Sequence, residues 1–344
     1  GQACSACHVG AFGPALTPFG REFKLNGYTM RVGNFSAPIS AMAVTSYLHT
    51  ATDHPPVADF ANNNNFSLDE ASIFLAGGID DHFGGFAQAT YDGIGKSFAW
   101  DNLDLRGTTK TTLDGSNLLL GVSVNNNPGT QDVWNTMPAW GFPYTSSDIA
   151  AGPAAATLLS DALAQNVIGG SFYAWWNSSL YAELGAYTSL GTGTLKSLGV
   201  GPAETSKLSG AAPYYRLAYQ KNFNGQMVEL GTFGLLSRLY PGRDTSAGTA
   251  DRINDYGFDA SYQTGLTDGF VSLNASYTNE TQNLRASRIL GSAANAHDTL
   301  HNFRLDGSYY WKNLIGGTVG VFHTSGAQDA LLYPDSRTGK PDSS

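Results

Sequence analysis

The segment YGFDASYQ (residues 256–263), which the turn GLTDG (265–269) joins to VSLNASYTN (271–279), decides the fold of this chain. In its first part Tyr256, Phe258 and Tyr262 share one face and Asp259 and Gln263 the other, because successive side chains of a strand point to opposite faces. The second part repeats the alternation, as does FRLDGSYYW (303–311). The pattern predicts antiparallel strands with one apolar and one polar face.

The composition also favours an all-β protein. The 344 residues include 41 Gly, 12% aromatic residues and only 14% charged residues, so the mixture that long helices prefer is scarce. No run of about 20 apolar residues occurs, which excludes a helical membrane span. A membrane barrel stays open, since it hides apolar residues at every second position. The net charge of −9 favours cations over nucleic acid as partners.

Alternating segments separated by turns recur along the chain from residue 39 onward. We expect thirteen strands, at residues 39–51, 67–77, 81–92, 97–109, 116–126, 166–177, 179–190, 212–222, 226–239, 254–264, 268–279, 301–312 and 314–325. Long and tight connections alternate between them, with only the third and fourth connections blurring the rule. That alternation is typical of outer-membrane barrels and not of soluble sandwiches or propellers.

The predicted fold is therefore a transmembrane antiparallel β-barrel. Bacterial single-chain barrels have even strand numbers, so about 16 strands are expected when the barrel is complete. We accordingly expect further strands beyond Ser344 and an upstream segment before Gly1. The long stretch WNTMPAWGFPYTSSD (134–148) is expected to fold over the barrel mouth.

The motif CSACHVG (4–10) contains both cysteines of the chain. C-x-x-C-H is the attachment sequence of c-type haem, with Cys4 and Cys7 forming thioethers and His8 binding the iron as proximal ligand. A structural zinc site would need a second ligand pair at short spacing. A thioredoxin-like dithiol would open a long helix, but VGAFGPALTPFG (9–20) is rich in Gly and Pro. A disulfide gives no reason for the histidine.

The stretch PALTPFGREFKLNGYTM (14–30) offers residues for a minimal haem pocket. Side chains that can cover the ring are Phe12, Phe19, Phe23, Leu25 and Tyr28, while Arg21 and Lys24 can meet the propionates. About 30 residues cannot bury a haem alone. We therefore expect residues 1–35 to form a cytochrome plug inside a barrel formed by residues 36–344.

The second axial ligand of the iron has several candidates. Thr45, Tyr47 and His49 share one face of the first strand, and Met42, Val44 and Leu48 share the other. The more apolar face should meet lipid, so His49 is expected to point inward and is the first candidate for the distal ligand. Met42 and Met30 follow, and His82, beside a tight turn, comes last.

Five stretches together carry a resemblance to a known family. They are CSACHVG, LTPFGREFKLNGYTM (16–30), NNNNFSLDEASIFLAGGIDDHFGGFAQATYDGI (62–94), WDNLDLR (100–106) and NNNPGTQDVWNTMPAWGFPY (125–144). With them the chain resembles the fused outer-membrane monohaem cytochrome–porins, a family that includes the Fe(II) oxidases of iron-oxidising bacteria. The resemblance implies a haem plug in a barrel of the bacterial outer membrane. It also implies oxidation of extracellular Fe(II) and electron transfer to a soluble periplasmic c-type cytochrome.

Three other functions remain open at this point. The chain is also compatible with a porin that carries a structural haem, with electron transfer from a donor other than iron, and with a soluble cytochrome domain on a binding scaffold. No motif of a metalloprotease, serine hydrolase, P-loop or dinucleotide-binding enzyme occurs.

Overall fold

The computed structural model describes residues 2–11, 13–30, 39–51, 53, 59–137, 147–150, 152–202, 205–312, 314–334 and 336–342. Thirteen long strands form one antiparallel sheet in chain order, and the short β8 (Lys207–Leu208) pairs with β10 beside them. The long strands are β1 (Ile39–Leu48), β2 (Asn65–Gly78), β3 (Phe83–Asp92), β4 (Ser97–Leu113), β5 (Ser116–Asn125), β6 (Val167–Trp176), β7 (Leu180–Ser189), β9 (Ala212–Phe223), β10 (Gln226–Tyr240), β11 (Asp251–Leu266), β12 (Gly269–Asn283), β13 (His297–Trp311) and β14 (Ile315–Gly326). Each predicted strand is confirmed with shifted ends.

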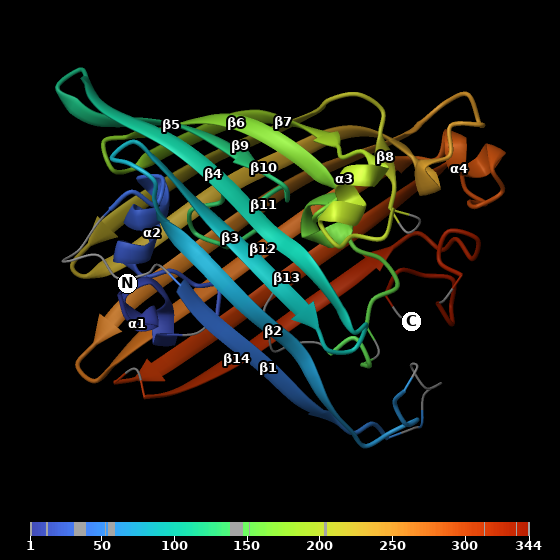
Figure 1. Cartoon of the computed structure of the whole chain (residues 1–344), viewed down its shortest axis with the longest axis horizontal. Helices are drawn as coiled ribbons and strands as arrows, with labels where there is room; N and C mark the ends of the chain where they lie inside the picture. The colour runs from blue at the N-terminus through green and yellow to red at the C-terminus, as the bar shows by residue number, and fades with distance from the viewer. Residues whose placement is uncertain are drawn as a thin grey trace.

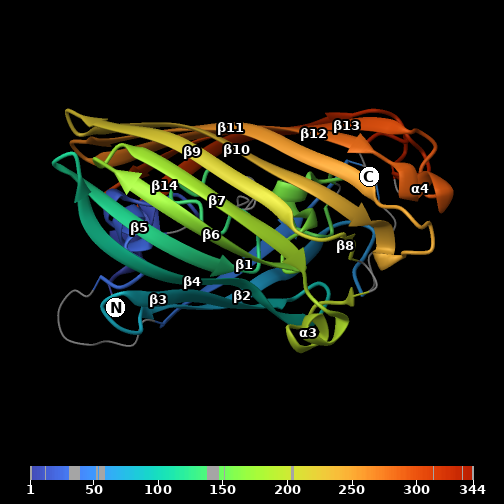
Figure 2. The same ribbon diagram turned by 90° about the horizontal axis from the view of Figure 1, so that it is seen from above.

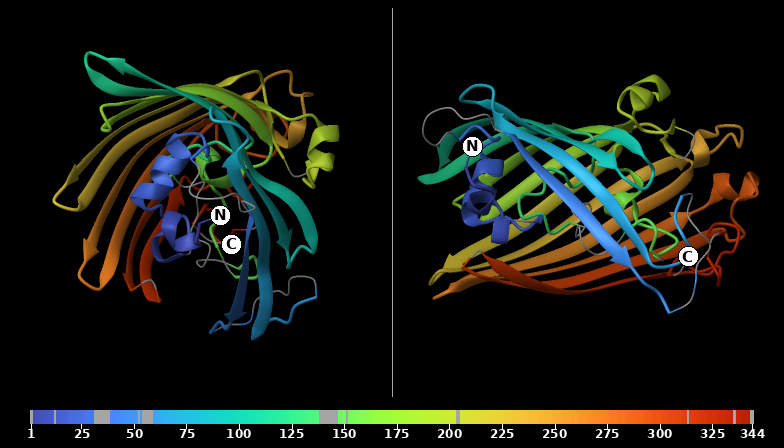
Figure 3. Two further views of the ribbon diagram at one scale, coloured as in Figure 1. Left: turned by 60° about the vertical axis from the view of Figure 1, so that its left-hand side comes forward. Right: turned by 60° about the horizontal axis from the view of Figure 1, so that its bottom comes forward.

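The sheet curls into an open barrel (Figure 1, Figure 3). Within the described residues β1 and β14 are the two ends of the strand order and are not paired with each other. Short turns gather at one end of the barrel and the longer connections at the other (Figure 2). The third connection, between β3 and β4, is the exception, because it is a four-residue turn at the end with the long connections. β4 extends to Leu113, which leaves a two-residue turn at Asp114 and Gly115, both with positive φ. The fourth connection therefore obeys the alternation that the sequence had blurred.

The two faces of the sheet differ in polarity as the alternation predicts. On β11 the inward Asp255 and Asp259 are buried, while the outward Phe258 is 66% exposed. Its partner in the register, Tyr277 of β12, is also exposed and lies on the same face. Large exposed apolar side chains occur on most strands, so the outer surface is apolar and the interior polar.

Two short helices begin the chain and lie on the concave side of the sheet, at the end with the short turns (Figure 3). They are α1 (Cys4–Cys7) and α2 (Pro18–Leu25). Thr17 caps α2 by accepting a hydrogen bond from the Gly20 amide at 3.1 Å, and Pro18 occupies the first turn. The same hydroxyl donates to the Ala6 carbonyl at 2.6 Å, which ties the two helices together.

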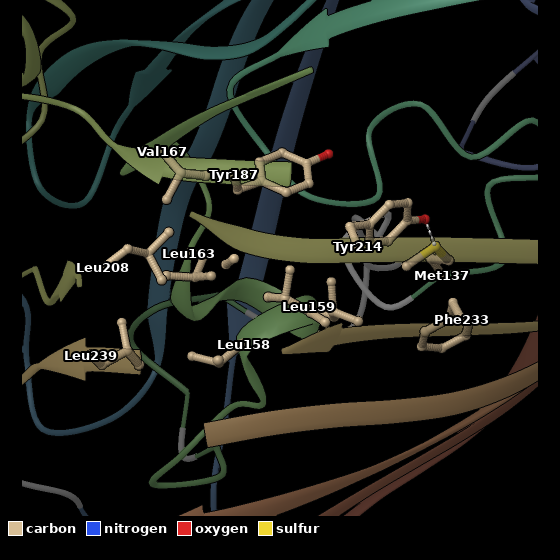
Figure 4. Packing of buried hydrophobic residues seen from close by; sticks show 12 residues of the cluster. Met137, Leu158, Leu159, Leu163, Val167, Tyr187, Leu208, Tyr214, Phe233 and Leu239 are labelled. Atoms are coloured by element: carbon tan, nitrogen blue, oxygen red, sulfur yellow. Dashed lines mark hydrogen bonds between the residues drawn. The ribbon is translucent and has the colours of Figure 1, made fainter. Parts of the chain in front are cut away.

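The barrel interior is also filled by the connection between β5 and β6. Its described parts include η2 (Leu158–Ala162), whose Leu158 and Leu159 pack with Leu163 against Phe233 and Tyr214 of the wall (Figure 4). Trp134 and Val133 join a second buried cluster with Leu25 of α2. This connection therefore lies inside the barrel where its placement is described. Residues 138–146, most of the stretch expected over the mouth, lie outside the described residues.

The remaining helices, α3 (Thr192–Ser197) and α4 (Arg285–Ile289), lie in longer connections at the end opposite the plug (Figure 1). Among the described residues no helix is both long and apolar enough to cross a membrane.

The polarity of the two faces leads to a test in lipid. Phe258 lies at the middle of β11 on the apolar face, so Phe258→Lys should lower the free energy of unfolding by about 2–4 kcal/mol in bilayer vesicles, because a lysine would face hydrocarbon. Leu266→Lys, on the same face near the strand end, should cost about 0–1 kcal/mol. The measurement is denaturant unfolding followed by tryptophan fluorescence. Equal costs for both variants would show that this surface does not face lipid.

Candidate functional site

The C-x-x-C-H motif folds into a single helical turn. α1 contains both cysteines, and the His8 amide donates to the Cys4 carbonyl at 2.8 Å. Both thiols are free, with Cys4 exposed and Cys7 half-buried. A β-carbon at Gly20 would overlap the Cys7 carbonyl oxygen, so the close contact of α2 with α1 requires glycine there. The turn therefore presents two accessible thiols and a histidine from one rigid element.

The His8 ring is held in a defined orientation. Its Nδ1 lies 2.8 Å from the Gly13 carbonyl oxygen, and because a carbonyl only accepts, Nδ1 carries the proton. Burial lowers the pKa of His8 below its ordinary value, which favours the neutral ring. A neutral imidazole with Nδ1–H bound to a carbonyl leaves Nε2 as a free lone pair, as in histidines that bind metals.

A cleft of about 300 Å³ lies beside His8. The plug contributes His8, Gly10 and Thr17 to its lining. The barrel contributes Phe270 from the start of β12 and Lys312 from the turn after β13. Lys312 and Asp268, also in the lining, form an ion pair at 3.5 Å. The cleft therefore lies between the plug and the barrel end that carries the short turns.

Arg21 and Lys24 hold the plug to the barrel interior. Arg21 Nη1 donates to the Leu16 carbonyl at 2.7 Å and to Gln263 Oε1 of β11 at 2.5 Å. Lys24 Nζ donates to the Asp132 carbonyl and to Asn135 Oδ1, both at 2.6 Å. Burial lowers the pKa of Arg21 to about 10 and that of Lys24 to about 7. These bonds give both residues an anchoring role, and their contact with propionates stays a prediction.

The predicted aromatic residues divide into two groups. Tyr28 is buried, and its hydroxyl donates to Asp104 Oδ2 of β4 at 2.7 Å. Phe23 meets Tyr28 edge to face with ring centroids 5.5 Å apart. Phe19 is half-buried on α2, and Phe12 lies outside the described residues. Tyr28 and Phe23 therefore link the plug to the wall.

The expected orientation of the first strand is wrong. Ser46 of β1 lies opposite the buried Ser67, and the two hydroxyls share a hydrogen bond at 3.1 Å. The even-numbered residues of β1 therefore face inward. Met42 therefore points inward, and the exposed His49 points outward, where its Nδ1 lies 2.8 Å from Asn64 Oδ1. Both faces of β1 mix polar and apolar residues, so apolarity alone could not assign them.

The distal candidates also differ in their position along the barrel. His49 lies seven residues beyond Met42, about 23 Å along an extended strand and toward the end opposite the plug. Met30 is half-buried just after the plug helices, and His82 is exposed in the turn between β2 and β3 at the plug end. The described residues contain no group of three or more His, Cys, Asp or Glu side chains that could hold a metal ion by itself.

A buried charge cluster was missed by sequence reasoning. Arg216 of β9 is fully buried and lies 3.0 Å from an Asp132 carboxylate oxygen, 3.4 Å from Glu229 and 2.7 Å from Asp259. The Asp132 carboxylate also accepts the Trp134 amide at 3.2 Å, which shapes the start of the interior connection. Inward charges on adjacent strands β9, β10 and β11 were the available signal, but the loop residue Asp132 carries no such periodicity.

Comparisons with known proteins add little to this geometry. No family model matches the chain, and no curated protein matches it. Among solved structures, the chain is similar to the outer membrane channel DcaP of Acinetobacter baumannii, with 9% identity over 88% of this chain and 99% of that chain and a TM-score of 0.34.

The lowered pKa of Lys24 predicts how plug docking depends on pH. The pKa is about 7 when docked and 10.5 in water, so the undocked plug binds more protons between these values and docking strengthens as pH rises from 7 to 10.5. Proteolysis of the plug at a series of pH values should therefore slow with rising pH relative to Lys24→Met, which lacks the titrating amine. Parallel pH profiles for the two proteins would contradict this prediction.

Proposed function

We propose that the chain is an outer-membrane electron conduit in which one c-type haem accepts electrons from extracellular Fe(II) and passes them to a soluble periplasmic c-type cytochrome. The observation that carries the proposal is the α1 turn, where two free thiols and a histidine with a fixed ring lie together at the mouth of an open barrel.

The residues of this turn fit a covalently attached haem. Cys4 and Cys7 would add through their thiolates to the two vinyl groups, and His8 Nε2 would bind the iron. The Gly13 carbonyl holds the His8 ring through Nδ1, so the ligand is oriented before it binds. When bound, the haem would supply a one-electron couple between the ferrous and ferric states. Among the candidates for a distal ligand, Met42 is retained because it points inward, and Met30 because it is half-buried just after the plug helices.

The protein surrounds this site with groups that keep it in place. Arg21, Lys24 and Tyr28 bind the plug to three parts of the interior, namely β11, the connection after β5, and β4. The cleft beside His8 opens at the end with the short turns, which is the periplasmic end in outer-membrane barrels. A soluble electron carrier would therefore approach from this end and iron from the other.

The filled interior favours a conduit over a porin with a structural haem. Leu158, Leu159 and Leu163 pack against the wall, and Trp134 and Val133 pack against the plug side of the interior. Solute passage would require these buried clusters to leave, whereas an electron needs no open path. The net charge of −9 also favours the approach of a cation such as Fe(II).

The attachment of haem is tested first. The purified full chain should retain haem after denaturation, because two thioethers hold it, and the double variant Cys4→Ala, Cys7→Ala should lose it. Haem staining after denaturing electrophoresis measures this. If the wild-type chain, expressed with haem-attachment machinery, carries no covalent haem, the proposal of a haem cofactor is wrong.

The donor is tested separately by stopped-flow absorbance. Fe(II) mixed with the oxidised wild-type protein at neutral pH should reduce the haem rapidly. His8→Ala should keep the thioether-bound haem but show an altered spectrum and slow reduction, because the iron loses its proximal ligand. If Fe(II) does not reduce the wild-type haem but a chemical reductant does, iron is rejected as the donor and the haem site still stands.

A further inference from the structure

A series of aromatic side chains, buried from Tyr28 onward, begins at the plug. Phe23 of α2 meets Tyr28 with ring centroids 5.5 Å apart. The Arg106 guanidinium lies 5.4 Å from the Tyr28 ring centroid and also 5.4 Å from the ring centroid of Tyr173 on β6. Arg106 is therefore placed between two tyrosines, one on the plug and one on the wall.

The series continues into the barrel interior. The Tyr173 and Tyr181 rings are stacked with centroids 5.8 Å apart, and Tyr181 meets Trp134 edge to face at 5.5 Å. Trp134 belongs to the connection after β5, and its ring also lies 5.9 Å from that of Trp175. Tyr28, Tyr173, Tyr181 and Trp134 are each 5% exposed or less, so all four rings lie away from water, and Arg106 bridges Tyr28 and Tyr173.

Beyond Trp134 further oxidisable side chains follow toward the opposite end. The Arg216 guanidinium lies 5.4 Å from the Trp134 ring and 5.9 Å from the Phe233 ring. Phe233 packs in one cluster with Met137, Tyr214 and Tyr187 (Figure 4). The Tyr214 hydroxyl donates to Met137 Sδ at 3.4 Å, and the Tyr214 and Tyr187 rings are 5.9 Å apart.

One tyrosine of the series also has a base in place for its proton. A phenol that loses an electron becomes strongly acidic, so its oxidation is easiest where the proton can move at the same time. The Tyr28 hydroxyl donates to Asp104 Oδ2 at 2.7 Å, and Arg106 Nε donates to the same oxygen at 2.7 Å. The same Asp104 oxygen therefore lies within hydrogen-bond distance of both the Tyr28 phenol and the Arg106 guanidinium.

We propose that Tyr28, Tyr173, Tyr181 and Trp134 form a redox-active series that carries electrons from the barrel interior to a strong one-electron oxidant at the plug. In the first step Tyr28 gives one electron to the oxidant and its phenol proton to the Asp104 carboxylate, which leaves a neutral tyrosyl radical and a carboxylic acid. An electron from Trp134 then refills Tyr28 through the intervening Arg106, Tyr173 and Tyr181 side chains, whose protons stay in place, and the Asp104 proton returns to the Tyr28 phenol. Trp134 is left as a radical cation until the reductant refills it.

The oxidant belongs to the peroxide-derived class, which arises where Fe(II) meets oxygen, and the electron that finally refills the series comes from a one-electron reductant at the opposite mouth. In this respect the inference rests on the proposed function, where that reductant is Fe(II) and becomes Fe(III). The series would spare Cys4, Cys7 and His8 from oxidation. The electron-transfer property of the rings does not depend on the haem.

The series is tested without haem in the full chain. Cys7→Ser leaves the exposed Cys4 as the only thiol, so one thiol-reactive ruthenium photosensitiser can be attached there. Flash oxidation should produce tyrosyl and tryptophanyl radicals, measured by transient absorption and electron paramagnetic resonance. Tyr28→Phe and Trp134→Phe, which keep a ring at each position, should each lose signal. The matched control Tyr256→Phe removes an outward phenol and should leave the signal unchanged.

The outcomes separate this inference from the proposed function. Radicals that persist unchanged in both Tyr28→Phe and Trp134→Phe, or that lie on outward tyrosines, would show that the buried rings only pack the interior. Slower radical formation in heavy water for the parent, with no such effect in Tyr28→Phe, would support proton transfer to Asp104. A chain that proves to carry no haem would reject the proposed function and leave this result as it stands.

Discussion

The structure depends on the two-residue alternation of its strands, because every strand that turns an apolar face outward must turn polar groups inward. Inside a wide barrel these groups need hydrogen-bond partners, and the chain's own interior segments supply many of them. Asp255 Oδ2 and Glu280 Oε2 accept the amides of Leu159 and Leu158 at 2.8 and 2.9 Å, so two inward carboxylates hold the start of η2. The connection after β5 is thus fixed by the polar face of the sheet.

The plug follows the same constraint from the other side. Two short helices cannot form a core of their own, and the buried residues of α2 find their partners in the barrel. Leu25 packs with Trp134 and Tyr173, while Arg21, Lys24 and Tyr28 each bond to a different part of the interior. A rigid seat for α1 results, and the two thiols and His8 take their geometry from it.

Strands were predictable from the sequence because alternation is a local property, and all thirteen segments appear in the sheet. The sequence did not predict which face of β1 points inward, because the two faces have similar polarity. Ser46 bonds to Ser67 and so places Met42 on the inward face. The interior position of Asp132 was also beyond sequence reasoning. It depends on Arg216, 84 positions away, and such a pairing leaves no periodic trace in a loop.

The function of the α1 turn was predicted from five letters of sequence, but its surroundings needed the fold. Arg106 illustrates why. It is fully buried and pairs with Asp104, two residues earlier on β4. It also donates to the backbone carbonyls of Lys24 and Gln131 at 3.0 and 2.8 Å. One guanidinium therefore joins the plug, the wall and the interior connection. A charge in that position stiffens all three against one another, because each carbonyl that moved away would leave a buried donor unsatisfied. The rings of Tyr28 and Tyr173 lie against this same group, so the packing that fixes the plug also fixes the distances between them.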